Sequence, residues 1–204
     1  MIPVREQPEP TSFEVAVRQP GQAFLRATPN PTKGQWKKAR YWQNAIDDLY
    51  GAYDGICAYS AEWIPPSTGE ASVDHFIPKS ANPRLAYEWP NYRLSARRFN
   101  LYKQDTADVI DPFTLQADWF VLDFPSLQVK ANSTLNPDDT DLVWRTIDRL
   151  RLNDERSIKS RQRWVRDFCE GHFAFDYLMK NAPFIAYELL RQGLRDAIVS
   201  IYRT

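Results

Sequence analysis

The spacing of hydrophobic positions predicts one helix near the N-terminal third of the chain. From Gly34 to about Tyr53, apolar residues recur at helical intervals, which predicts a packing helix over residues 34–54. Residues 1–33 lack this period and contain many of the prolines. We therefore expect a Pro-rich N-terminal arm with one short strand at Phe13–Val17.

The C-terminal half shows a change from strand-like to helical periods. Two apolar runs between residues 119 and 129 predict a small hairpin. Apolar residues then share one face from Asp139 to Leu150, and Asn153 is a candidate N-cap for a second, longer helix. Pro183 is tolerated in a first turn and can begin a last helix. Residues 106–204 are thus predicted to form a hairpin and a helical extension.

Residues 55–105 alternate short apolar runs with turn-forming residues. The predicted elements are a short strand at Ile56–Tyr59, strands at Ser72–Phe76 and Arg93–Ala96, an irregular loop at 78–90, and a helix from Arg98 to about Gln104. The fold class expected is α+β, with a ββα core inside a mainly helical protein. We expect residues 34–204 to form one compact unit.

The candidate chemistry lies in this ββα segment. Asp74 and His75 are adjacent, and Asn91 and Asn100 follow on the same segment. Hard cations such as Mg²⁺ prefer oxygen ligands, which Asp74 and the side-chain carbonyl of Asn100 can supply. A histidine with a pKa near 6.5 can deprotonate water. The alternatives are structural, because a loop asparagine is usually a turn residue and Asn100 could cap a helix.

The order and spacing of these residues carry a resemblance. Three segments, taken in order, resemble the HNH, or ββα-metal, endonucleases. They are Val73-Asp74-His75-Phe76-Ile77-Pro78-Lys79-Ser80, Glu88-Trp89-Pro90-Asn91-Tyr92-Arg93-Leu94 and Asn100-Leu101-Tyr102-Lys103. The resemblance implies a metal-dependent endonuclease that holds one divalent cation, Mg²⁺ or a similar ion such as Mn²⁺. His75 is then the general base and Asp74 and Asn100 are the metal ligands. Asn91 would hold the loop against the strand that bears His75.

A weaker resemblance covers most of the remaining chain. Residues 147–153, followed by a basic helix, look like the C-terminal part of HNH proteins in bacterial defence operons. That group resembles the nuclease subunit of Septu-type anti-phage systems, which accompanies an ATPase. The resemblance implies a protein partner of that kind.

The chain departs from the family pattern at the positions that bind a structural zinc ion in many relatives. Many relatives carry two Cys-x-x-Cys pairs, but the corresponding segments here are Cys57-Ala58-Tyr59-Ser60 and Ala96-Arg97-Arg98-Phe99. A structural zinc site needs four cysteine or histidine ligands, so we expect no structural zinc. Cys57 and Phe99 are instead predicted to be core residues.

The number and distribution of charged residues bear on whether the chain binds nucleic acid. The chain has 26 basic and 26 acidic residues and a formal net charge of zero, which predicts weak unaided affinity for nucleic acid. Basic residues nonetheless gather around the motif, and four are predicted to contact nucleic acid: Lys79, Arg93, Arg97 and Lys103. DNA is the expected substrate, with RNA open. The second hypothesis is a decayed HNH scaffold that binds nucleic acid or a protein without catalysis.

The compartment is inferred from what the sequence lacks. Two cysteines do not make a disulfide framework, and no apolar run approaches the length of a membrane span. The N-terminal residues have no hydrophobic signal core. We expect a cytoplasmic protein that does not associate with a membrane.

Overall fold

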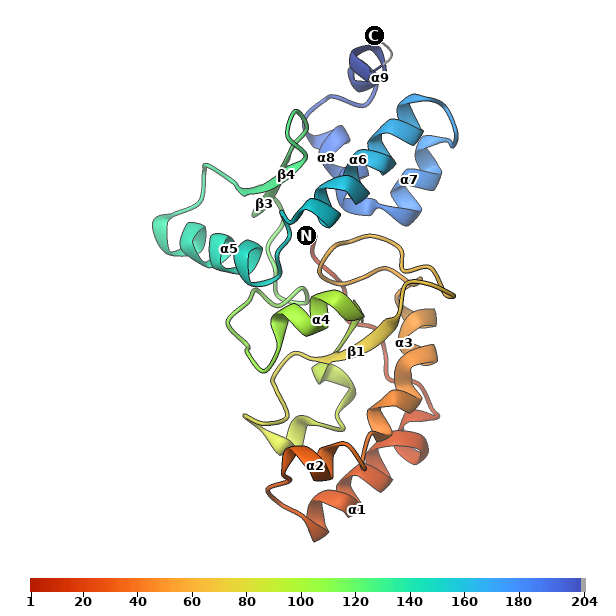
Figure 1. Cartoon of the computed structure of the whole chain (residues 1–204), viewed down its shortest axis with the longest axis vertical. Helices are drawn as coiled ribbons and strands as arrows, with labels where there is room; N and C mark the ends of the chain where they lie inside the picture. The colour runs from red at the N-terminus through yellow and green to blue at the C-terminus, as the bar shows by residue number, and fades with distance from the viewer. Residues whose placement is uncertain (203–204) are drawn as a thin grey trace. The chain divides into compact units, whose positions relative to one another are not determined.

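The computed structural model describes residues 1–202 and shows an α+β protein with two small antiparallel sheets, as predicted (Figure 1). The chain folds as two compact units. The first, here called the β1–β2 unit, comprises Arg5–Ala58 and Ile64–Ala107. The second, the C-terminal unit, comprises Met1–Val4, Tyr59–Trp63 and the chain from Asp108 onward. Residues 34–58 and 64–107 thus lie in the first unit, and the residues from Asp108 onward, which the sequence predicts to belong with them, lie in the second.

The N-terminal arm is helical, and the predicted strand at Phe13–Val17 is wrong. A π-helical turn, Glu14–Arg18, runs directly into α1, Gln19–Ala27. Phe13 and Val17 are one turn apart and both buried, whereas Val15 is 70% exposed. The apolar residues therefore follow a helical face, which is also the spacing that lets Arg18 pair with Glu14.

The helix predicted over residues 34–54 is divided into three pieces. These are α2, Lys33–Trp36, a 3₁₀ turn, Tyr41–Ala45, and α3, Ile46–Ala52. The break occurs at Arg40, whose φ of −86° and ψ of 41° are not helical. The aromatic residues of the segment still pack together, with the rings of Trp36 and Trp42 6.1 Å apart.

The central element of this unit is a hairpin followed by a helix. β1, Ala71–His75, pairs antiparallel with β2, Tyr92–Ala96, and α4, Arg97–Lys103, follows β2 at once and packs against both strands (Figure 1). The order strand, strand, helix agrees with the prediction. The predicted strand at Ile56–Tyr59 is wrong, since the segment forms only an isolated bridge at Ile56 and continues as a turn; the Ala58 N–H donates to Leu94 O.

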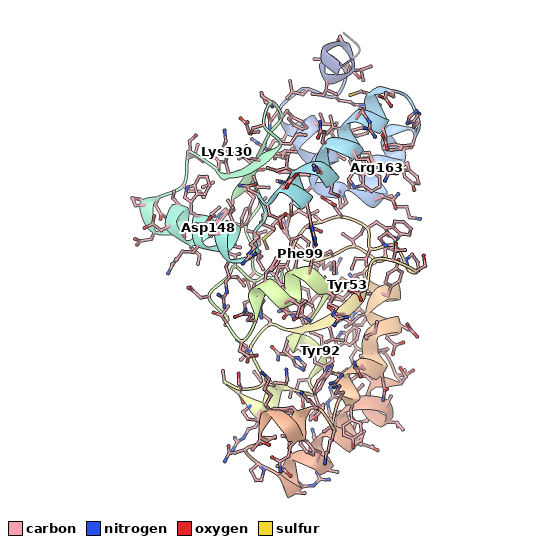
Figure 2. All side chains as sticks on the ribbon, viewed as in Figure 1. Tyr53, Tyr92, Phe99, Lys130, Asp148 and Arg163 are labelled. Atoms are coloured by element: carbon pink, nitrogen blue, oxygen red, sulfur yellow. The ribbon has the colours of Figure 1, made fainter. Side chains whose placement is uncertain are left out.

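The core of the β1–β2 unit is rich in aromatic residues. Tyr92 on β2 and Phe99 on α4 are almost fully buried (both labelled in Figure 2). Phe13 packs edge-on against Tyr92 with ring centroids 5.6 Å apart. Cys57 is also buried, so Cys57 and Phe99 lie in the core as predicted. Burial of each large apolar side chain stabilises the fold by roughly 1.5–3 kcal/mol relative to exposure.

The C-terminal unit contains the predicted hairpin and helices, with some boundaries shifted. Its elements are β3, Phe120–Asp123; β4, Gln128–Ala131; α5, Pro137–Arg149; α6, Glu155–Cys169; α7, Phe175–Asn181; α8, Pro183–Arg191; and α9, Ala197–Tyr202. The N-cap of α6 is Asp154 and not Asn153. The Asn153 amide instead pairs with the backbone N–H and C=O of Val129 on β4.

The helices of both units are short or polar. Among the residues that the structure describes, no helix combines the length and the apolar character that a membrane crossing requires.

Candidate functional site

Asp74 and His75 lie at the end of β1 and point to opposite faces of the hairpin. The Asp74 carboxylate meets Lys103 on α4, while the His75 ring packs against Trp42 and Tyr92. Successive residues of a strand alternate in this way, and the alternation persists to the last residue of β1. The two side chains are 2% and 7% exposed, so both are part of the interior.

Lys103 provides a cation inside the protein next to Asp74. Its ammonium Nζ lies 3.2 Å from Asp74 Oδ2 and also donates to the carbonyls of His75 and Phe76, at 2.9 and 3.0 Å. The side chain is fully buried. Burial lowers the pKa of Lys103, and the Asp74 charge opposes that shift. The donors of Lys103 face inward here, so the predicted phosphate contact would require the side chain to turn outward.

His75 is enclosed by aromatic rings and one carbonyl. Its ring stands edge-on to Trp42 and Tyr92, with centroids 5.0 and 5.2 Å apart. Nε2 lies 2.9 Å from Ala86 O, which also accepts from the Tyr92 hydroxyl. A carbonyl can only accept, so Nε2 carries the proton and Nδ1 bears the lone pair.

The electrostatic surroundings keep His75 neutral. Burial, followed by the positive charge of Lys79, lowers the pKa of His75 to about 3. The bond to Ala86 O partly opposes that shift, and the Lys103 charge adds to it. The imidazole is therefore neutral at neutral pH, but a pKa this far below 7 makes it a weak base while it stays buried.

Asn91 fastens the loop between β1 and β2. Its Oδ1 accepts from Ile77 N at 2.8 Å, and its Nδ2 donates to Ile77 O and Leu85 O, both at 3.0 Å. The side chain is buried. This geometry confirms that the Asn91 amide bridges backbone groups and holds the loop beside the end of β1.

Asn100 lies inside α4 and faces β1. Its Nδ2 donates to Val73 O at 2.9 Å and to Ser72 Oγ at 3.2 Å. The N-cap of α4 is Ala96, so Asn100 is not a helix cap. Because the carbonyl of Val73 needs a donor, the amide orientation is fixed and Oδ1 is the atom that a hard cation would take.

The basic residues predicted to bind nucleic acid are divided between surface and core. Arg93 is buried, and its guanidinium donates to Pro90 O and Tyr92 O, so the predicted contact with nucleic acid would require its release from these carbonyls. Arg97 is 59% exposed and pairs with Glu70. Lys79 is half-buried, with Nζ 5.2 Å from the ring centroid of Trp42. Lys79 and Arg97 are thus the two that reach solvent.

A pocket of about 510 Å³ opens beside Trp42. Its lining includes Lys33, Lys37, Arg40 and Lys79, together with Trp36 and Trp42. Sequence reasoning assigned residues 34–54 to core packing and missed this feature. The available signal was the interleaving of basic and aromatic residues in Lys33-Gly34-Gln35-Trp36-Lys37-Lys38-Ala39-Arg40-Tyr41-Trp42.

Another group of potential metal ligands lies at the end of α6. Asp167, Glu170 and His172 place one ligand atom each within 4.8 Å of one another. His172 and Glu170 are exposed, and Asp167 is already paired with Arg166. Acidic surface groups of this kind are common without an ion, so the group adds nothing to the site at β1.

Known protein families and curated proteins give no match to this chain.

Proposed function

We propose that this protein is a metal-dependent endonuclease of the HNH type, which hydrolyses phosphodiester bonds of nucleic acid, with DNA as the main substrate. The observation that supports it best is the packing of α4 on the hairpin. Asp74 and Asn100 both direct polar atoms into the layer between β1 and α4, and His75 ends β1. Asn91 fixes the adjoining loop.

The residues supply complementary parts of a hydrolysis. A divalent cation held by Asp74 and Asn100 Oδ1 would neutralise the phosphate charge and assist the leaving oxygen. The lone pair on His75 Nδ1 takes the proton of the attacking water. Opening of the ring to water would return its pKa from about 3 toward 6.5, where a histidine is effective as a general base. Asn91 maintains the position of the loop after β1 and does not take part in proton transfer.

The proposed reaction requires a local rearrangement that brings the His75 ring and the Asp74 carboxylate, which lie on opposite faces of the hairpin here, to the same phosphate. The Lys103 ammonium lies within 3.3 Å of both oxygens of Asp74, so a metal ion must displace it or share the carboxylate. His75 must also become accessible to water, since its ring is almost fully buried. We propose that substrate or partner binding provides this opening.

The same ion pair favours a second candidate function. A buried lysine neutralises Asp74 without a metal, which is what a scaffold that no longer performs catalysis would retain for stability. In that case the chain is a binding module for nucleic acid or for a protein. The two candidates differ in one measurable property, cleavage.

Plasmid nicking in Mg²⁺ or Mn²⁺ tests the nuclease. The expected result is conversion of supercoiled to nicked or linear plasmid, abolished by EDTA and by His75→Gln. Lys159→Ala is the control, because Lys159 is 68% exposed in the C-terminal unit. Absence of cleavage in both metals, by folded protein with its partner present, would leave the binding module as the function.

We also propose that the chain acts in the cytoplasm with an ATPase partner, as an effector of bacterial anti-phage defence. The support is the zero net charge and the aromatic side chains of the C-terminal unit, such as Trp144, which is 40% exposed. Co-expression with the product of the neighbouring gene, followed by size-exclusion chromatography, tests this. A monomer that cleaves at full rate without the neighbour would contradict it.

A further inference from the structure

The pocket beside Trp42 is cationic and partly aromatic. Lys33 and Lys37 come from α2 and its C-cap, Arg40 from the break before the 3₁₀ turn, and Lys79 from the loop after β1. Asp105 is the one carboxylate in its lining. Trp36 and Trp42 give it apolar surface. Cations beside flat rings suit a ligand that carries both an anionic group and a planar group.

Three of these cations have no competing carboxylate. Lys33, Lys37 and Arg40 are exposed, and none forms an ion pair within residues 1–202. Cationic side chains around a hollow raise the local concentration of anions. Lys79 is different, because burial lowers its pKa and Asp105 and Asp74 oppose the shift. A bound anion would further favour its charged form.

The pocket is connected to the candidate base through one side chain. Trp42 lines the pocket, and its ring also contacts His75 with centroids 5.0 Å apart. Lys79 covers the same Trp42 ring at 5.2 Å and contributes to the low pKa of His75. A ligand that draws Lys79 away from Trp42 therefore changes the surroundings of His75.

We propose that this pocket binds one nucleotide unit of a single-stranded segment of nucleic acid. The phosphate is held by Lys37 and Arg40, with Lys33 and Lys79 beside them, and the base packs against the Trp42 ring. The choice of a strand over a free nucleotide rests on the proposed function. Occupation of the pocket places the neighbouring phosphodiester on the His75 side of Trp42.

Two adjacent lysines provide a matched test. Lys37 lines the pocket and Lys38 does not, although both are exposed and both carry one positive charge. Binding of a short fluorescent single-stranded oligonucleotide is measured by anisotropy in EDTA, so that cleavage plays no part. Lys37→Ala should weaken binding about three- to tenfold and reduce the salt slope by about 0.7, the value for one phosphate contact on a single strand. Lys38→Ala should leave both unchanged.

The remaining outcomes distinguish binding in the pocket from non-specific attraction to the basic surface. They also distinguish failure of the pocket proposal from failure of the nuclease proposal. Equal loss in Lys37→Ala and Lys38→Ala would overturn the proposal, because it would indicate attraction to the whole basic surface. A 5′-mononucleotide that competes as well as the oligonucleotide would overturn the assignment to a strand. Lys37-dependent binding by a wild-type protein that cleaves nothing in Mg²⁺ or Mn²⁺ would support the pocket and contradict the nuclease.

Discussion

Lys103 Nζ lies 3.2 Å from Asp74 Oδ2 in the interior of the β1–β2 unit, where both side chains are shielded from solvent. The sequence predicts a metal ligand at Asp74, yet the folded chain supplies its own cation there. The ammonium also has two backbone carbonyls as acceptors, so its three N–H groups are directed inward. The pair can therefore stabilise the fold and compete with a metal ion for the same carboxylate.

The first prediction concerns the stability that this pair provides. Lys103→Met removes one partner and leaves the Asp74 carboxylate buried without its cation, which costs about 3–5 kcal/mol. Urea denaturation followed by circular dichroism measures the loss. Arg97→Ala is the control on the same helix, because the Arg97–Glu70 pair is exposed and should contribute almost nothing.

The double variant checks the cause of that loss. Asp74→Asn combined with Lys103→Met removes the uncompensated charge, so it should be clearly more stable than Lys103→Met alone. A double variant as unstable as the two single losses added together would indicate that packing of the Lys103 stem, and not its charge, is what matters.

The second prediction concerns the loop after β1. Asn91→Ala leaves Ile77 N, Ile77 O and Leu85 O without their side-chain partner, and buried groups without partners cost roughly 1–3 kcal/mol. Hydrogen exchange of the Ile77 amide should become much faster, while that of Val73 in β1 changes less. Unchanged exchange at Ile77 would show that another group can hold the loop.

The hairpin-helix segment was predictable because local signals agree there. Alternating apolar residues give β1 and β2, and the residues after Ala96 favour a helix. The helical arm at Glu14–Ala27 was not, because its prolines and the run Phe13-Glu14-Val15-Ala16-Val17 also fit an extended strand. Only the tertiary burial of Phe13 and Val17 on one face decides between them.

The sequence could assign the residues of the candidate site to their elements but could not predict the surroundings of their side chains. Sequence spacing places Asp74, His75, Asn91 and Asn100 around β1 and α4, and the amide role of Asn91 follows from its position in the loop. No sequence pattern states whether a charged side chain points outward. Lys103 and Arg93 turn inward because backbone carbonyls next to them need donors, and those carbonyls are positioned only by the fold.

The third prediction concerns pH. The unfolded chain binds a proton on His75 near pH 6.5, whereas the folded chain does so only near pH 3. Between these values the unfolded state holds more protons. The contribution of neutral His75 to the free energy of unfolding is therefore complete above pH 6.5 and is lost as the pH falls toward 3. The slope approaches about 1.4 kcal/mol per pH unit within that window.

Comparison with His75→Gln isolates this contribution from the carboxylates that titrate in the same range. Unfolding free energies of both proteins, measured by denaturant between pH 4 and 8, should show a shallower acid loss in His75→Gln. Parallel curves would show that His75 is protonated in the folded state as easily as in the unfolded one. The variant should also lose some stability at neutral pH, because the imidazole packs against Trp42 and Tyr92.

The fourth prediction concerns the metal. Mn²⁺ measured by isothermal titration should bind weakly to the wild-type protein, because Lys103 occupies the Asp74 carboxylate. Lys103→Gln keeps a hydrogen-bond donor and removes the positive charge that opposes a bound cation, so the affinity should rise about tenfold or more. Asp74→Asn should abolish binding.

Asp123→Asn is the control, because that carboxylate lies on β3 and pairs with Lys130. Equal Mn²⁺ affinity in wild type and Asp74→Asn would place the metal elsewhere and remove the basis for hydrolysis at β1.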